Sequence, residues 1–242
     1  MRIVVTNCNT TQEMTEEIVR GARAAAGPGT TVTGLTPAWG PESAEGWLDS
    51  YLSAAAVIDL LRTYDGPPYD AVVMAGFGEH GREGVRELVD VPVVDITEAA
   101  AHLACLLGRR YGVVTTLERS CGQIEDSLEL AGVGRNCAAV VGTGLSVLDL
   151  GDGDRERTEE AFLAAAEQAG RAGAEVLVLG CAGMTGLERV VGEKLGLPVV
   201  DGVAAAVKLA ESLVALGLTT SRAGSYAKPV PKRRVWGRGM TA

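Results

Sequence analysis

The chain has 242 residues and a net charge of −9 at neutral pH, with 47% hydrophobic and 22% charged residues, enough for a substantial buried core. The acidic excess argues against nucleic acid and against an anionic membrane as partners, since both are bound through surplus Lys and Arg. No apolar run approaches the roughly 20 residues that span a bilayer, and the first residues enter a strand without a signal-peptide layout, so the cytoplasm is the expected compartment.

Valine- and isoleucine-rich runs alternate with alanine- and leucine-rich stretches along the whole chain, which predicts an α/β protein with parallel sheets. The expected strands are Ile3–Thr6, Thr31–Leu35, Ala71–Ala75, Val91–Ile96, Gly112–Thr115, Ala138–Val141, Val176–Leu179 and Pro198–Asp201. The expected helices are Met14–Ala26, Ala44–Arg62, Arg82–Val89, Glu98–Leu107, Arg119–Ala131, Arg155–Ala172, Leu187–Leu195 and Val203–Leu216.

One pattern occurs twice. The run from Ala71 to Glu79 is similar to the run from Val176 to Met184, at an offset of 105 residues, and Gly76 stands where Cys181 stands in the second copy. A Pro-Val-Val-Asp motif also occurs twice, at Pro92 and Pro198. This repetition predicts a duplication with two pseudo-symmetric lobes, each a mostly parallel sheet flanked by helices, and an active site in the cleft between them.

The expected division of the chain follows from this duplication. Residues 1–97 together with 207–225 form the first lobe, because the last helix returns to it, and residues 98–206 form the second lobe. Residues 226–242 are rich in Pro and in basic side chains, which predicts an irregular C-terminal tail.

The cysteines do not predict a disulfide framework or a zinc site. There are five of them, an odd number without CxxC spacing, and the chain has only two histidines, so no metal site is expected. Cys181 is the strongest candidate for a functional thiol. It follows a buried strand and precedes glycine and a helix, where backbone N–H groups lower a thiol pKa; the alternative is a small buried hydrophobic residue.

Polar residues follow the strands that should surround Cys181. Asn7, Cys8, Asn9 and Thr10 come after the first strand, and Thr115 and Thr116 after the central one. Helix capping explains one threonine, but two asparagines and two further threonines offer hydrogen bonds to ligand oxygens. In the turn after Ala75, Glu79 and His80 are candidates for acid–base chemistry, with an ordinary solvated loop as the alternative.

These motifs resemble the aspartate/glutamate/hydantoin racemase superfamily, and within it the hydantoin and allantoin racemases. Asn7-Cys8-Asn9-Thr10 is similar to the family's Asn-Pro-Asn-Thr loop, with Cys8 in place of proline. Phe77-Gly78 resembles its Cys-Phe-Gly turn and Gly180–Met184 its second cysteine turn.

The resemblance implies proton transfer without a cofactor at a carbon next to a carbonyl, with one cysteine on each face of that carbon. The expected partner is a small substrate with carboxylate or imide carbonyls, and a homo-oligomer is expected. The implied site has Cys181 as the proton carrier, with His80 or Glu79 as further catalytic candidates. The implied substrate-binding residues are Asn7, Asn9, Thr10, Gly76, Phe77, Gly78, Thr115, Thr116, Ala182 and Gly183.

This sequence departs from the family where it matters for inversion, because Gly76 replaces the first cysteine. Three interpretations follow. His80, Glu79 or Cys8 serves the empty face and the protein is a racemase or epimerase. A single cysteine protonates one face only, as in the arylmalonate decarboxylases, which would make the protein a lyase. The third is a small-molecule-binding protein without catalysis. Racemisation of a hydantoin-type compound is the leading interpretation, because motifs at both ends of the chain resemble that subgroup.

Overall fold

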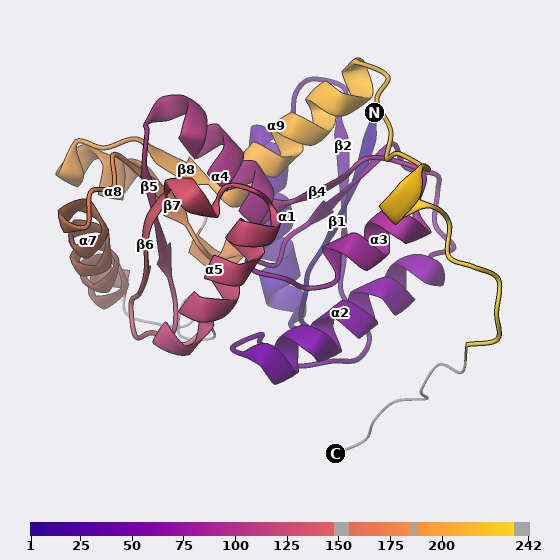
Figure 1. The fold of residues 1–242 in the computed structure, drawn as a ribbon, viewed down its shortest axis with the longest axis horizontal. Coiled ribbons are helices and arrows are strands. Elements are labelled where there is room, and N and C mark those ends of the chain that lie inside the picture. Colours follow the sequence, from indigo (N-terminus) through magenta and orange to yellow (C-terminus); the bar gives the residue numbers. More distant parts are fainter. Residues whose placement is uncertain (148–154, 185–187, 235–242) are drawn as a thin grey trace.

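Two four-stranded parallel sheets form the centre of the molecule (Figure 1). The structure is a computed structural model that describes residues 1–147, 155–184 and 188–234. The first sheet has the order β2-β1-β3-β4 and the second the order β6-β5-β7-β8. The strands are β1 (Arg2–Thr6), β2 (Thr31–Leu35), β3 (Ala71–Met74), β4 (Val93–Asp95), β5 (Tyr111–Thr115), β6 (Cys137–Gly142), β7 (Val176–Leu179) and β8 (Val199–Asp201).

Helices cover the sheets, and each predicted helix is present with its ends shifted by a few residues. They are α1 (Gln12–Ala25), α2 (Trp47–Arg62), α3 (Arg82–Leu88), α4 (Ile96–Leu107), α5 (Cys121–Leu130), α7 (Arg155–Arg171), α8 (Glu188–Leu195) and α9 (Gly202–Ala215). The α/β class and the two-sheet architecture predicted from the sequence are therefore confirmed. Among the described residues, no helix is long and apolar enough to cross a membrane.

The two halves have an equivalent backbone hydrogen bond at the strand ends that lead to Gly76 and Cys181. Just after β3, the N–H of Ala75 donates to the carbonyl of Thr6 on β1 at 2.9 Å. Just after β7, the N–H of Gly180 donates to the carbonyl of Val114 on β5 at 2.7 Å. The residue that follows is Gly76 in the first half and Cys181 in the second. Their equivalence, which the sequence repeat predicts, is thus also structural.

Helices α4 and α9 join the halves. Each begins directly after the last strand of its half, and each is capped by the aspartate that ends that strand: Asp95 accepts from the N–H groups of Thr97 and Glu98, and Asp201 from that of Ala204. Each helix then packs across the boundary between the halves, α4 against β7 and α9 against β3.

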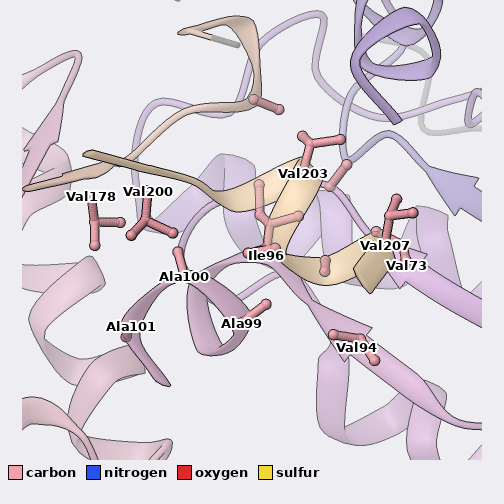
Figure 2. Packing of buried hydrophobic residues seen from close by; sticks show 14 of the residues in the cluster. Val73, Val94, Ile96, Ala99, Ala100, Ala101, Val178, Val200, Val203 and Val207 are labelled. Carbon is pink, nitrogen blue, oxygen red and sulfur yellow. The ribbon is translucent and has the colours of Figure 1, made fainter. Parts of the chain in front are cut away.

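A single buried hydrophobic cluster runs through this crossing. In Figure 2, Val178 and Val200 lie near Ala100 of α4, and Val73 lies near Val207 of α9. The helices approach closely because the residues between them are small: a side chain at Gly202 would lie 3.0 Å from the carbonyl oxygen of Ile96. This packing fixes the two sheets, and so fixes the strand ends that carry the site.

The described part of the C-terminal segment lies on α3, with Arg222 and Lys228 both paired to Asp90. Beyond a short 3₁₀ turn at Gly224–Tyr226 it has no helix or strand up to residue 234, and residues 235–242 of the predicted tail lie outside the described part of the chain. The exact residues that divide the two lobes stay a prediction.

Candidate active site

A pocket lies where the carboxyl ends of β1, β3, β5 and β7 meet. Both halves line it: Asn7, Cys8 and Gly76 come from the first, and Thr116 and Cys181 from the second. The carboxyl edge of parallel strands is the usual place for a ligand in α/β proteins, because the turns there are free to vary while the sheet holds them in place. The cleft predicted between the lobes therefore exists.

Cys181 is positioned by β7 and by the glycine before it. A side chain at Gly180 would lie 2.7 Å from a Val113 methyl group and 2.9 Å from the Val114 carbonyl oxygen, so only glycine lets the chain pass this close to β5. The Cys181 thiol reaches the pocket, and the residue is partly exposed. After it the chain turns into a 3₁₀ helix, Ala182–Met184, which includes the predicted residues Ala182 and Gly183. Ala182 lines the pocket.

Cys8 is the second thiol in the pocket. All five cysteines lie in the described part of the chain, where none forms a disulfide and each is partly buried; Cys8 and Cys181 are the two that line the cavity. Burial raises the pKa of the Cys8 thiol to about 12, and the negative charge of a Cys181 thiolate contributes to this rise. When Cys181 carries the negative charge, Cys8 is therefore the neutral thiol of the pair.

The Asn7–Thr11 loop is braced by its own side chains. The Asn7 amide donates to Asn9 Oδ1 at 2.8 Å and to Thr15 Oγ1 at 3.1 Å, while its Oδ1 accepts from the Asn9 N–H. Asn9 Oδ1 also accepts from the Thr11 N–H at 3.0 Å. Asn7 and Asn9 line the pocket, but these bonds use most of their hydrogen-bonding capacity. Thr10 bonds the Pro41 carbonyl and is absent from the lining.

The side chains of the matching loop in the second half, Thr115 and Thr116, make fewer hydrogen bonds within the protein. Thr115 donates to the Gly180 carbonyl at 3.1 Å and so ties the ends of β5 and β7 together. Thr116 lines the pocket and is 4% exposed, and its hydroxyl bonds no residue in the described part of the chain. It is the predicted substrate-binding side chain that remains most available to a ligand.

The turn after β3 offers backbone donors. Gly76 and Phe77 line the pocket, and their N–H groups make no hydrogen bond within residues 1–147, 155–184 and 188–234. Gly78 has a φ of 119°, which favours glycine, and its N–H is taken by Thr97 Oγ1 at 2.9 Å. Two adjacent free N–H groups at a pocket wall can stabilise an oxyanion.

The acid–base candidates Glu79 and His80 differ in placement. The Glu79 carboxylate accepts from the N–H groups of Gly81 and Arg82 at 2.7 and 3.1 Å, so it holds the start of α3, and it is absent from the pocket lining. His80 lines the pocket and is 4% exposed. Its Nε2 lies 3.3 Å from the Phe77 carbonyl and its Nδ1 is buried without a partner in the described part of the chain. Desolvation lowers the His80 pKa to about 4, so the ring is neutral at pH 7.

A sequence model described as Asp/Glu/hydantoin racemase matches residues 3–210. The chain belongs to the Asp/Glu/hydantoin racemase family. Among curated relatives, the hydantoin racemase of Paenarthrobacter aurescens is 37% identical over 96% of this chain and 99% of its own, and that of Pseudomonas sp. NS671 is 38% identical over 97% and 94%.

Solved structures of this racemase family are similar as well. An allantoin racemase from Pseudomonas fluorescens has a TM-score of 0.95 and 54% identity, covering 97% of this chain and 100% of that one. An allantoin racemase from Klebsiella pneumoniae has a TM-score of 0.92 and 39% identity, with 97% and 96% coverage. Arylmalonate decarboxylase, with a TM-score of 0.60 at 16% identity, shares the fold alone.

The pocket of this family member also has walls that the sequence motifs did not indicate. One polar set, Ser120 and Gln123, lies at the start of α5. A sequence signal exists for it, because Ser120, Gln123 and Ile124 recur at helical spacing just after the Thr115-Thr116 turn. The other unpredicted residues are Met14, Ile18, Ala44, Ala75 and Val147. Ala44 precedes α2 and Val147 follows β6, and neither belongs to such a pattern. Within the described residues no group of His, Cys, Asp and Glu side chains could hold a metal ion.

Proposed function

We propose that the protein racemises a hydantoin-type ring, with allantoin as the first substrate to test, and that it does so without a cofactor. The observation that carries this proposal is the Cys181 thiol at the wall of a pocket between two homologous sheets, in a chain that belongs to the Asp/Glu/hydantoin racemase family. Allantoin comes first because the allantoin racemase of Pseudomonas fluorescens is 54% identical, against 37% and 38% for the hydantoin racemases.

The chemistry of such a ring suits this pocket. The ring carbon that bears the substituent is flanked by a carbonyl, so removal of its proton gives an enolate whose charge rests on that oxygen. The free N–H groups of Gly76 and Phe77 and the hydroxyl of Thr116 are the donors available to this oxygen. Donors that are already in place stabilise developing charge without reorganisation, and one such donor is worth about 10²–10³-fold in rate.

The pocket also has room for specificity. Apolar side chains from α1, α5 and the loops after β6 line the part away from the strand ends: Met14, Ile18, Ile124 and Val147. They would contact the substituent on the ring, while the polar strand ends hold the ring itself. The ring and the reacting carbon are thus proposed to lie over Gly76 and Cys181.

The test follows single enantiomers of allantoin and of an alkyl hydantoin by circular dichroism, with an enzyme-free blank that corrects for spontaneous racemisation. Enzyme in D₂O should exchange the ring proton, as seen by NMR. Cys181→Ala should lower racemisation about 10²–10⁴-fold, the usual contribution of a general acid or base. Cys105→Ala is the matched control, because Cys105 is partly buried and lies outside the pocket. If the enzyme racemises none of these substrates and exchanges none of their ring protons, the proposal is contradicted.

Gly76 favours a second candidate, in which proton transfer occurs on one face only, as in an arylmalonate decarboxylase. Carbon dioxide release from a disubstituted malonate, without racemisation of either ring, would favour that candidate. The chemistry would still depend on Cys181, so the same cysteine variants apply.

A further inference from the structure

The position of a side chain at Gly76 is already occupied. A Cβ atom there would lie 2.4 Å from His80 Cδ2, 2.7 Å from Cys8 Cβ and 2.9 Å from Cys8 Sγ. Real side chains do not approach this closely, so Cys8 and His80 fill the space in which a cysteine at position 76 would begin. The absent side chain has thus been replaced by neighbours, and one of them carries a thiol.

Strand pairing explains how a residue so far away in sequence reaches this place. β1 and β3 are adjacent parallel strands, and Thr6 is the ladder partner of Met74. Cys8 and Gly76 each lie two residues beyond that pair, at strand ends that are about 4.8 Å apart. Equivalent places on neighbouring strands point into the same cleft.

Of the three side chains that could serve the face left by Gly76, Cys8 is the one whose titratable atom is among the three atoms nearest to a Cβ at that position. Glu79 is absent from the pocket and caps α3. His80 turns a carbon, Cδ2, toward Gly76, and its Nε2 faces the Phe77 carbonyl. Cys8 Sγ lies 2.9 Å from where a Cβ of residue 76 would be, and it interacts electrostatically with Cys181.

We infer that Cys8 is the second proton carrier of the site, a catalytic thiol that acts from the end of β1 in place of one at position 76. This inference rests on the proposed racemase function. In one direction the Cys181 thiolate takes the proton from the substrate carbon, and the C–H electron pair moves toward the carbonyl oxygen. The Cys8 S–H bond then breaks, its proton passes to the opposite face of the carbon, and the negative charge stays on Cys8. In the reverse direction the thiols exchange roles.

The charge state of the pair fits this cycle. Each transfer needs one thiolate and one thiol. Because burial and the charge of Cys181 both raise the pKa of Cys8, the two sulfurs do not ionise together. The resting pair therefore carries at most one negative charge and keeps one proton to donate.

The experiment is enantiomer-resolved exchange in D₂O under reducing conditions, with Cys8→Ala, Cys181→Ala and Cys105→Ala compared with the native enzyme. Each enantiomer of allantoin is followed separately by NMR for deuterium uptake and by circular dichroism for inversion. We expect Cys8→Ala and Cys181→Ala to lose racemisation by about 10²–10⁴-fold each. Each should still exchange the proton of one enantiomer, and the two variants should act on opposite enantiomers. Cys105→Ala should behave as the native enzyme.

Racemisation by Cys8→Ala at the native rate would overturn the inference and leave the proposed function standing. Loss of exchange with both enantiomers in Cys8→Ala would also overturn it, because Cys181 alone should serve one face. A native enzyme without racemisation or exchange would instead remove the proposed function itself.

Discussion

The two halves of the site use the same backbone but divide their side chains differently. In the second half, β7 carries the thiol, Cys181, and β5 carries a hydroxyl, Thr116. In the first half, the place equivalent to Cys181 is Gly76, and the thiol stands on the neighbouring strand end as Cys8. Both pairs lie two residues beyond a ladder pair that joins adjacent strands, Thr6 with Met74 and Val114 with Leu179.

In a duplicated site of this kind, what matters is where a side chain lies in the pocket, more than which position in the sequence carries it. Two adjacent strands are about 4.8 Å apart, so a side chain at the end of either strand can reach almost the same point, provided that the other strand has glycine there. The Cys8 side chain therefore requires glycine at position 76, because a Cβ there would lie 2.7 Å from Cys8 Cβ. A proline at position 8, as in the related motif, would leave no thiol on this face.

The largest expected effect concerns His80, which sits beside Cys8 and Gly76. Its pKa is lowered to about 4 by burial, against 6.5 when solvated. His80 in the unfolded chain therefore takes up a proton below about pH 6.5, whereas in the folded protein it does so only near pH 4. Neutral, buried His80 contributes its full stabilisation above pH 6.5, and this contribution is lost as the pH falls toward 4. The loss amounts to about 3 kcal/mol by pH 4.

Urea unfolding of the native protein and of His80→Gln at pH 7.5 and pH 4.0 measures this loss. The native protein should lose about 3 kcal/mol relative to the variant, because glutamine does not titrate. Other buried carboxyls, Asp95 among them, are common to both proteins and cancel in the difference. A difference that does not change with pH would mean that His80 is solvated or paired, and would make it an acid–base candidate again.

The next prediction concerns moving the thiol of the first half to position 76, the place equivalent to Cys181 in the second half. Gly76→Cys should destabilise the protein by about 2–3 kcal/mol, because the new Cβ meets both Cys8 and His80 at under 3.0 Å. Cys8→Gly combined with Gly76→Cys removes the contact with Cys8 but keeps the one with His80, so it should recover part of the stability. It should also recover part of the racemisation, since it restores a thiol to the same face. Unfolding and racemisation assays on the single and double variants measure both quantities. A stable, fully active Gly76→Cys variant would show that the space beside residue 76 is open.

The fold is predictable from the sequence because its signals are local. Buried parallel strands are continuous apolar runs such as Val176–Leu179, and the duplication is visible in the amino-acid repeat that pairs Gly76 with Cys181. The Cys181 turn and the pocket position of Asn7 and Thr116 follow from the same local patterns. What the sequence does not predict is which strands are neighbours. The contact between Cys8 and Gly76 depends on the order β2-β1-β3-β4, in which β1 lies beside β3 although β2 separates them along the chain.

The roles of individual polar residues are equally out of reach of the sequence. Its motifs predict that Asn7 holds substrate oxygens, yet the Asn7 amide is engaged by Asn9 and Thr15 and braces the loop that carries Cys8. Glu79 is a candidate acid by its position in the sequence, yet it caps α3. Carboxylates and amides serve backbone N–H groups and ligands equally well, and only the fold decides which they meet.

The smallest expected effect lies one residue before the two compared positions. Gly180 and Ala75 are equivalent, because each donates its N–H to the adjacent strand in the same way. Alanine fits at 75, but a side chain at 180 would meet Val113 and the Val114 carbonyl at under 3.0 Å. Gly180→Ala should therefore cost about 1 kcal/mol, measured by urea unfolding. Gly170→Ala on α7 is the matched control, since a side chain there meets nothing within 4 Å, and it should stabilise by about 0.5–1 kcal/mol. The expected loss would show that the chain before Cys181 passes so close to β5 that even a methyl group is excluded. Equal stability of the two variants would mean instead that this part of the chain can shift, and that Gly180 does not hold Cys181 in place.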